Sequence, residues 1–360
     1  MKNEALIRDP VFQLNLLVWM AKPQPADGYR VRPFFVERGF QLMYIQQPFP
    51  LPQETQRAIA GVNLGISAAP EPELLLQRTG DKKALYAEAK ANSFSPDSTT
   101  AKQARGHLLA CGPAFGEVMQ PLEQALLCYL VPADKCPAMS ACLAALVAEL
   151  RELCLKPGEF STNGLAISGT DLVYSVDDRF KQFTGAAEGS LAILQNLEAD
   201  TDPSPLLLVY SEDDSPDDQH RNFYRHALLQ KLVATLVCDA NLLPVGQTHS
   251  TTPRELAIKT TDEIFQYLAR ARQAGMERFI RKNIFGRVFS FWKDKPFSPV
   301  KLDHQRLQIS YKDNLAKEQF LEWLEDARRT NFSDEQVDEK QMLLFDEETS
   351  GASPNPPTTA

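Results

Sequence analysis

The sequence predicts an α/β protein in which a central mixed sheet is flanked by helices. Short apolar runs, such as residues 74–76 and 125–131, alternate with segments of helical period, which is typical of strands that alternate with helices. Strong turn residues at 156–158 interrupt this pattern, and from about residue 330 the chain becomes polar and acidic. We therefore expect a first domain over 1–155, a second, mixed α/β or mainly helical domain over 156–330, and a disordered tail over 331–360.

The N-terminal part contains three expected elements before the first long apolar run. Residues 11–20 are almost entirely apolar and form a helix or a strand, which the prolines at 23 and 25 end. Residues 29–46 are rich in aromatic and β-branched side chains and indicate one or two strands. A proline-rich connector over 46–52 leads to an expected helix within 51–67.

Residues 70–90 carry the clearest pattern of charged side chains. The apolar run 74–76, a polar turn and a second strand over 85–90 predict a hairpin. Period-2 geometry places Glu88 and Lys90 on one face of the second strand. Glu73 directly precedes the first strand and would approach that face, although Glu71 has the same parity. Two carboxylates beside an ammonium group are a means of holding a divalent cation next to a phosphate.

Three further elements are expected after this hairpin. Residues 100–109 form a helix that includes Gln103, residues 125–131 form a buried strand, and a helix follows over 139–154. With the helix before the hairpin, these elements and the Glu-x-Lys pattern resemble the PD-(D/E)xK nuclease superfamily over roughly residues 50–150. The core of that family has the order helix, three strands, helix, strand, helix. The resemblance implies a restriction-endonuclease-like core.

The resemblance implies a DNA endonuclease that depends on Mg²⁺ (or Mn²⁺). Glu73 and Glu88 would ligate the cation, Lys90 would stabilise charge on the phosphate, and Gln103 would position water or phosphate. Glu73 departs from the usual pattern of the family, in which Asp is commoner at that position. Lys102, Arg105 and His107 lie on or near the same helix and would contact DNA, or else are plain surface residues.

Two other functions fit the same residues. The core would serve as a catalytically inactive DNA-binding or assembly subunit that acts with partner proteins. Alternatively, the nuclease would belong to a bacterial DNA-processing or phage-defence system and act only with a partner ATPase or sensor subunit. The sequence contains no Walker-type phosphate loop, so energy-dependent translocation would have to come from another chain.

The expected second domain contains both strands and helices. Residues 212–218 form an acidic stretch that we interpret as a solvated loop before a helix, and only as a weaker alternative as a metal site. A capping threonine and Pro253 begin a second helix. The expected strands are 164–168, 172–176, 206–210 and 307–311, and the expected helices are 219–237, 253–282 and 314–329.

The net charge of −9 is unusual for a protein that binds phosphates, but basic residues gather between positions 269 and 295. Within 279–292 they interleave with aromatic residues, a pattern that suits a nucleic-acid groove and equally an amphipathic segment whose rings lie in the core. Arg281, Lys282 and Arg287 are the candidate DNA contacts in this segment.

The acidic tail contains one apolar island, residues 341–345. Its sequence, Gln-Met-Leu-Leu-Phe, is similar to the bacterial sliding-clamp-binding motif. Gln341 would supply amide hydrogen bonds, and Leu344 and Phe345 would fill an apolar pocket of the clamp. The alternatives are that this peptide docks on its own domain or that the match is coincidental.

Other composition features limit the class of protein. None of the six cysteines forms a Cys-x-x-Cys pair, so we expect no zinc ribbon, and buried, reduced thiols for all or most of them. The five histidines are scattered, which argues against a histidine-rich metal site. No apolar run is long enough to span a bilayer, and the N-terminus lacks the apolar core of a signal peptide. A cytoplasmic protein without a membrane partner is therefore expected.

Overall fold

The computed structural model describes residues 3–24, 30–113, 115–195 and 203–332. The chain divides into two compact units. The first comprises residues 1–217 together with 267–270, and the second comprises 218–266 and the residues from 271 onward.

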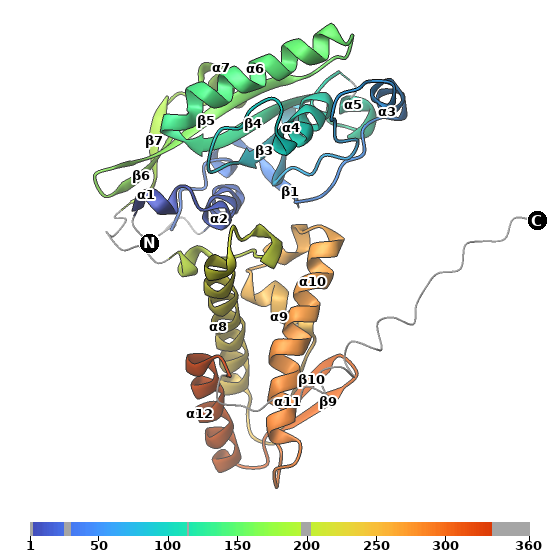
Figure 1. Cartoon of the computed structure of the whole chain (residues 1–360). Helices are drawn as coiled ribbons and strands as arrows, with labels where there is room; N and C mark the ends of the chain where they lie inside the picture. Colours follow the sequence, from blue (N-terminus) through green and yellow to red (C-terminus); the bar gives the residue numbers. More distant parts are fainter. Residues whose placement is uncertain (1–2, 25–29, 114, 196–202, 333–360) are drawn as a thin grey trace, which may run out of the picture. The chain divides into compact units, whose positions relative to one another are not determined.

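Among the described residues, the first unit contains a seven-stranded mixed sheet whose strands follow one another in chain order. β3, β4 and β5 are parallel, whereas the pairs on either side of them are antiparallel. Helices cover the sheet (Figure 1), so the predicted α/β class with a central mixed sheet flanked by helices is confirmed. The strands are β1 Gln41–Ile45, β2 Leu74–Arg78, β3 Lys83–Ala89, β4 Gln124–Pro132, β5 Glu159–Ser168, β6 Asp171–Ser175 and β7 Ser190–Leu194.

Two helices make the connections between the parallel strands. α4 joins β3 to β4, and α6 joins β4 to β5, as parallel neighbours require. The hydroxyl of Ser98 caps α4 by accepting a hydrogen bond from the Ala101 N–H at 3.2 Å. Apolar residues of both helices are buried in one core cluster that also contains Tyr86 and Tyr129 of the sheet. The helices of this unit are α1 Asn3–Leu6, α2 Pro10–Ala21, α3 Gln53–Ala60, α4 Thr99–Ala110, α5 Phe115–Val118, α6 Cys136–Glu152 and α7 Asp178–Thr184.

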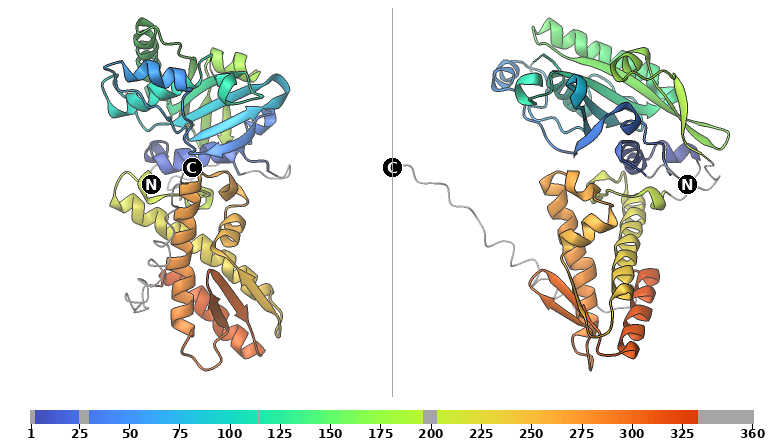
Figure 2. Two further views of the ribbon diagram at one scale, coloured as in Figure 1. Left: turned by 90° about the vertical axis from the view of Figure 1, so that its right-hand side faces the viewer. Right: turned by 180° about the vertical axis from the view of Figure 1, so that it is seen from behind.

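The apolar segment 11–20, open between helix and strand on sequence grounds, belongs to α2. Asp9 caps this helix, since its carboxylate accepts the N–H groups of Val11 and Phe12 at 2.8 and 3.1 Å. α2 contacts β2 and β3, and Figures 1 and 2 show it on the opposite face of the sheet from α6. Because α2 is apolar on nearly all sides, it is buried on nearly all sides. In the region 29–46, expected to give one or two strands, the described residues 30–46 form the single strand β1.

The predicted strand at 206–210 does not form, although residues 206–209 are buried. Their backbone groups bind side chains of α2 instead of a neighbouring strand. Asn15 accepts the N–H groups of Leu208 and Val209 at 2.6 and 2.9 Å and donates to the Val209 carbonyl at 2.9 Å. Trp19 Nε1 donates to the Leu206 carbonyl at 2.7 Å. The apolar pattern of this segment therefore indicates that it is buried, not that it is a strand. Its backbone groups bind side chains of α2, so they need no neighbouring strand.

Replacing Asn15 with leucine is expected to destabilise the protein by about 2–4 kcal/mol, because buried backbone groups of Leu208 and Val209 lose their partners. Urea denaturation measures the change. The exposed Gln124, at the start of β4, offers a control in Gln124→Leu, which should stay within about 0.5 kcal/mol of wild type. Equal stability of the two variants would contradict the role assigned to Asn15.

The domain boundary expected at 156–158 differs from the observed division, because β5, β6 and β7 continue the same sheet and the units divide at residue 217. The turn residues at 156–158 allow two backbone segments to pack closely and do not form a linker between domains. A Cβ atom at Gly158 would lie 2.2 Å from the Cys111 carbonyl oxygen, and one at Gly112 would lie 2.3 Å from the Lys156 carbonyl oxygen. Glycine is needed where two backbone segments approach this closely.

The second unit is mainly helical, with a small antiparallel sheet in the order β8-β10-β9. α8 and α12 lie side by side (Figure 2). The helix expected over 253–282 is interrupted near Asp262 and Glu263, which have positive φ angles of 52° and 70°. The elements are α8 Asp218–Leu242, β8 Thr248–Thr251, α9 Pro253–Thr260, α10 Arg270–Ile280, a π-helical turn Arg281–Phe285, α11 Gly286–Trp292, β9 Val300–Asp303, β10 Arg306–Ser310 and α12 Asn314–Thr330.

Candidate functional site

The hairpin of β2 and β3 brings the two predicted acids together. The antiparallel register pairs Leu74 with Ala87, so Glu73 falls opposite Glu88. The Glu73 N–H donates to Glu88 Oε1 at 3.2 Å, and the Ala89 N–H donates to Glu73 Oε2 at 2.7 Å. Backbone hydrogen bonds thus fix the orientation of both carboxylates.

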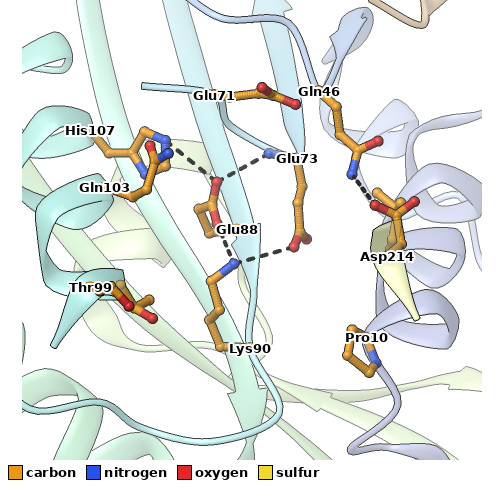
Figure 3. Close-up of a pocket in the computed structure, with 12 residues that line it drawn as sticks. Pro10, Gln46, Glu71, Glu73, Glu88, Lys90, Thr99, Gln103, His107 and Asp214 are labelled. Atoms are coloured by element: carbon orange, nitrogen blue, oxygen red, sulfur yellow. Dashed lines mark hydrogen bonds and ion pairs between the residues drawn. The ribbon is translucent and has the colours of Figure 1, made fainter. Parts of the chain in front are cut away.

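Lys90 lies between these carboxylates (Figure 3). Its Nζ is 2.9 Å from Glu88 Oε2 and 3.5 Å from Glu73 Oε1. Lys90 continues the ladder of β3, since its N–H donates to the Leu130 carbonyl at 2.9 Å. The expectation that Glu88 and Lys90 share one face of the strand is therefore met.

Burial gives the group unusual protonation behaviour. The side chains of Glu88 and Glu73 are only 3% and 15% exposed. Burial raises the pKa of Glu73 to about 8; Lys90 opposes this change, and the charge of Glu88 adds to it. Burial lowers the pKa of Lys90, but the two carboxylates outweigh it and raise that pKa above its usual value. The lysine is therefore held in its charged form.

All four predicted site residues line one cleft of about 540 Å³. Glu73, Glu88 and Lys90 come from the hairpin and its end, and Gln103 comes from α4. His107, one helical turn after Gln103, also lines the cleft and is 1% exposed. Its Nε2 lies 3.6 Å from Glu88 Oε1. Burial lowers the pKa of His107, against the charge of Glu88, which raises it.

Two further lining residues, Gln46 and Asp214, were not among the predicted site residues. Gln46 Nε2 donates to Asp214 Oδ1 at 3.4 Å, and Asp214 Oδ2 accepts the Ser211 N–H at 3.1 Å. Asp214 belongs to the acidic stretch interpreted as a solvated loop, and its charge contributes to the raised pKa of Glu73. The complete lining is Pro10, Leu14, Gln46, Glu71, Glu73, Glu88, Lys90, Thr99, Thr100, Gln103, His107 and Asp214.

The donors in the cleft suit a hard divalent cation. Its lining includes Glu71, Glu73, Glu88 and Asp214 and a single lysine, Lys90. Carboxylate oxygens are the ligands that Mg²⁺ prefers, and Mg²⁺ uses one or two of them with several waters. In the part of the chain that the structure describes, however, no group of three or more His, Cys, Asp or Glu residues is placed to hold a metal ion.

Arg105 does not face the solvent, contrary to its predicted role in DNA binding. It is 5% exposed, and its Nε donates to Glu149 Oε2 at 2.9 Å. The other two nitrogens donate to the carbonyls of Gly65 and Pro96 at 3.1 and 2.8 Å. The guanidinium thus ties α4 to α6 and to the preceding loops.

Replacing Arg105 with methionine is expected to lower the free energy of unfolding by about 2–4 kcal/mol, because buried acceptors lose their donors. Urea denaturation provides the measurement. Arg57→Met on α3 is the matched control, since Arg57 is exposed, and it should change stability by less than about 0.5 kcal/mol. A stable Arg105→Met variant with weakened DNA binding would restore the original prediction.

The other predicted DNA contacts lie outside the cleft lining. Lys102 is exposed on α4. Arg281 and Lys282 are partly exposed on the π-helical turn of the second unit. Arg287 Nη1 donates to the Asn331 carbonyl at 3.1 Å, so it anchors the end of α12. Of the aromatic rings within 279–292, Phe285 and Trp292 are buried, whereas Phe279, Phe289 and Phe291 are partly exposed.

Comparison with known proteins gives no relative for this chain: no family model, curated protein or solved structure matches it. In the part of the chain that the structure describes, no helix is long and apolar enough to cross a membrane. The predicted docking residues Gln341, Leu344 and Phe345 lie outside the described residues.

Proposed function

We propose that the protein is a metal-dependent nuclease that hydrolyses DNA phosphodiester bonds and resembles the PD-(D/E)xK superfamily. The observation that carries this proposal is the convergence of Glu73, Glu88 and Lys90 in one cleft, with Gln103 presented by the next helix. A buried carboxylate pair with one lysine and an open cleft is a suitable arrangement for binding a cation and a phosphate together.

The order of elements supports the same proposal. The core order quoted for the family is helix, three strands, helix, strand, helix, and the chain has α2, β1-β2-β3, α4, β4 and α6. The leading helix in this alignment is α2 rather than the segment 51–67. α3, which lies in that segment, falls between β1 and β2. The resemblance would then extend from residue 10 to about 152.

Each side chain has a defined task in this mechanism. Glu73 and Glu88 would hold Mg²⁺ or Mn²⁺, and such a cation polarises the phosphate and lowers the pKa of bound water. Lys90, charged and fixed on Glu88 Oε2, would stabilise the negative charge that develops on the phosphate. Gln103 would orient the attacking water or the phosphate. Thr99 and Thr100, at the N-terminus of α4, line the same cleft, where backbone N–H groups favour an anion.

We infer the other binding partners of the protein from its charged residues and its sequence motifs. Lys102, Arg281 and Lys282 would contact the DNA backbone, as basic residues do without regard to sequence. Gln341, Leu344 and Phe345 would bind a sliding clamp and bring the protein to replication or repair sites. A partner ATPase or sensor subunit would supply translocation or activation in a DNA-processing or phage-defence system.

Cleavage of supercoiled and linear DNA by the full chain, with Mg²⁺ and with Mn²⁺, tests this proposal. We expect cleavage that EDTA abolishes and that Glu88→Gln reduces by about 100-fold or more. Cleavage that Glu88→Gln leaves unchanged would reject the site.

The alternative is a nuclease-like subunit without catalytic activity. The specific observation in its favour is that the Lys90 ammonium forms ion pairs with both carboxylates, 2.9 Å from Glu88 Oε2 and 3.5 Å from Glu73 Oε1. Calorimetry distinguishes the two functions: binding of Mn²⁺ or Mg²⁺ that Glu88→Gln removes supports the nuclease, and no heat of binding in the wild type supports the inactive subunit.

A further inference from the structure

An aromatic groove of about 390 Å³ lies in the second unit, where α11 meets α12. Phe291 and Trp292 of α11 line it together with Trp323 of α12. The rings of Phe291 and Trp323 stack with their centroids 4.5 Å apart, and Trp292 meets Trp323 edge-on at 5.9 Å. Phe291 and Trp323 are partly exposed, so the groove offers ring surface to a ligand. The other lining residues are Lys295, Pro296 and Gln319.

The C-terminal tail begins beside this groove. Phe332, the last described residue, is buried, and its ring centroid lies 5.9 Å from that of Trp323. Arg287 of α11 holds this end of the chain, because its Nη1 donates to the Asn331 carbonyl at 3.1 Å and its guanidinium lies 5.5 Å from the centre of the Phe332 ring. The tail is therefore anchored on the same aromatic cluster that forms the groove.

The docking peptide at 341–345 is within reach of the groove. Eight residues, 333–340, separate it from Phe332. An extended linker of this length spans up to about 30 Å, whereas the groove begins at the Trp323 ring that contacts Phe332. Such a short tether also keeps the peptide at an effective concentration on the order of 1 mM near the groove. Contacts too weak to hold a free peptide would therefore suffice to hold this one.

The side chains of the peptide match those of the groove. Its methionine, two leucines and phenylalanine are apolar groups that pack well on aromatic rings. Three acids follow the peptide directly, at 346–348. Lys295 lines the groove, and its Nζ lies 2.8 Å from the centre of the Phe291 ring. Acids beside the bound peptide would meet this positive charge, so both apolar character and charge favour the tail as the occupant.

DNA is a less favourable occupant of the groove. Bases would stack on the exposed rings, as they do in proteins that bind single strands. However, Glu318 and Glu322 are exposed on α12, next to Gln319 and Trp323 in sequence, and they would repel a continuous phosphate backbone. The tail peptide can direct its three acids toward Lys295 and away from these glutamates.

We propose that residues 341–345 dock in the aromatic groove of their own chain, with Leu344 and Phe345 against the rings of Phe291 and Trp323. The proposed function assigns the same peptide to a sliding clamp, so a clamp would have to displace it from the groove. The groove thus withholds the peptide from any partner that binds it weakly. This inference holds whether or not the cleft of the first unit cleaves DNA.

Photocrosslinking within the full chain tests this docking. The photoreactive residue benzoylphenylalanine replaces Phe345, and mass spectrometry of the protein at monomer mass locates the crosslink. We expect crosslinks to residues 291–296 or 319–323, and none to them when the same photoreactive residue replaces Thr358 near the end of the tail. The absence of crosslinks from position 345 to the groove, or crosslinks only between two chains, would overturn the proposal.

Hydrogen–deuterium exchange of the full chain gives a second measurement. Leu344→Asp with Phe345→Asp should speed exchange in 291–296 and 319–323 at least about threefold, because the docked peptide no longer protects them. Thr358→Asp with Thr359→Asp is the matched control and should leave this exchange unchanged. Unchanged exchange in the first variant would contradict the docking, and protection of the same segments by a single-stranded oligothymidylate would then assign the groove to DNA. DNA cleavage enters neither readout, so a failure here leaves the nuclease proposal intact.

Discussion

Replacing Lys90 with alanine is expected to lower the rate of DNA cleavage by about 100-fold or more, with little change in substrate affinity. The ammonium lies 2.9 Å from Glu88 Oε2 and is held in its charged form by two carboxylates. It therefore supplies a fixed positive charge in a partly buried cleft, where such a charge stabilises a developing anion more effectively than in water. Steady-state kinetics on a labelled duplex separate kcat from KM.

The fold should survive this substitution. Without Lys90, two buried carboxylates would face each other, but the raised pKa of Glu73 allows it to take up a proton and remain neutral. Lys135→Ala is the matched control, since Lys135 is a partly exposed lysine at the start of α6, away from the cleft lining. A folded Lys90→Ala variant that cleaves DNA at the wild-type rate would remove the lysine from the mechanism.

The hairpin part of the site is predictable from sequence because its geometry is local. Glu73, Glu88 and Lys90 lie on two strands joined by a short turn, so the alternation of side chains and one antiparallel pairing determine which of them meet. The position of Gln103 is predictable because parallel strands need a connecting helix, which is α4 here. The same face of α4 also carries His107. No long-range information is needed for these positions.

The opposite wall of the cleft is not predictable in this way. Asp214 and Gln46 are far apart in sequence and meet because α2 holds the segment before Asp214 through Asn15. An acidic stretch next to an apolar one has the same local pattern whether it faces solvent or a cleft. Hydrogen bonds between a side chain and a distant backbone segment produce no periodic pattern in the sequence. For the same reason the strand predicted at 206–210 was wrong.

The expected domain boundary at 156–158 and the expected uninterrupted helix over 253–282 differ from the structure for physical reasons that composition does not reveal. The glycine at 158 favours a linker, but its lack of a Cβ permits close contact with the Cys111 backbone directly before β5. The helical pattern over 253–282 continues across Asp262 and Glu263, whose positive φ angles interrupt the helix. Tertiary packing overrides local propensity at these positions.

Binding of a divalent cation is expected to tighten about 100-fold between pH 6 and pH 8 in the wild type and to level off above pH 8. A carboxyl group must lose its proton before it can ligate a metal, and burial raises the pKa of Glu73 to about 8. Each pH unit below that value therefore lowers the apparent affinity about tenfold. Calorimetry with Mn²⁺ in matched buffers measures the slope, and Glu73→Gln should show weak binding with no such slope. A slope that persists in this variant would assign the proton to another group.

When no cation is present, a rise in pH is expected to lower the stability of the fold through Glu73, whereas it strengthens cation binding. Between its ordinary pKa of about 4.5 and the folded-state value of about 8, the folded protein binds more protons at Glu73 than the unfolded chain does. Its contribution to stability is therefore fully present below pH 4.5 and is lost as the pH rises through 8. In EDTA at pH 9, Glu73→Gln should consequently resist urea better than the wild type, whereas Glu54→Gln on the exposed face of α3 should not differ from it. A variant that gains stability and loses cation binding at once would show that Glu73 is retained for its function at a cost to the fold. If Glu73→Gln is less stable than the wild type at pH 9, its carboxylate is instead a structural partner of Lys90.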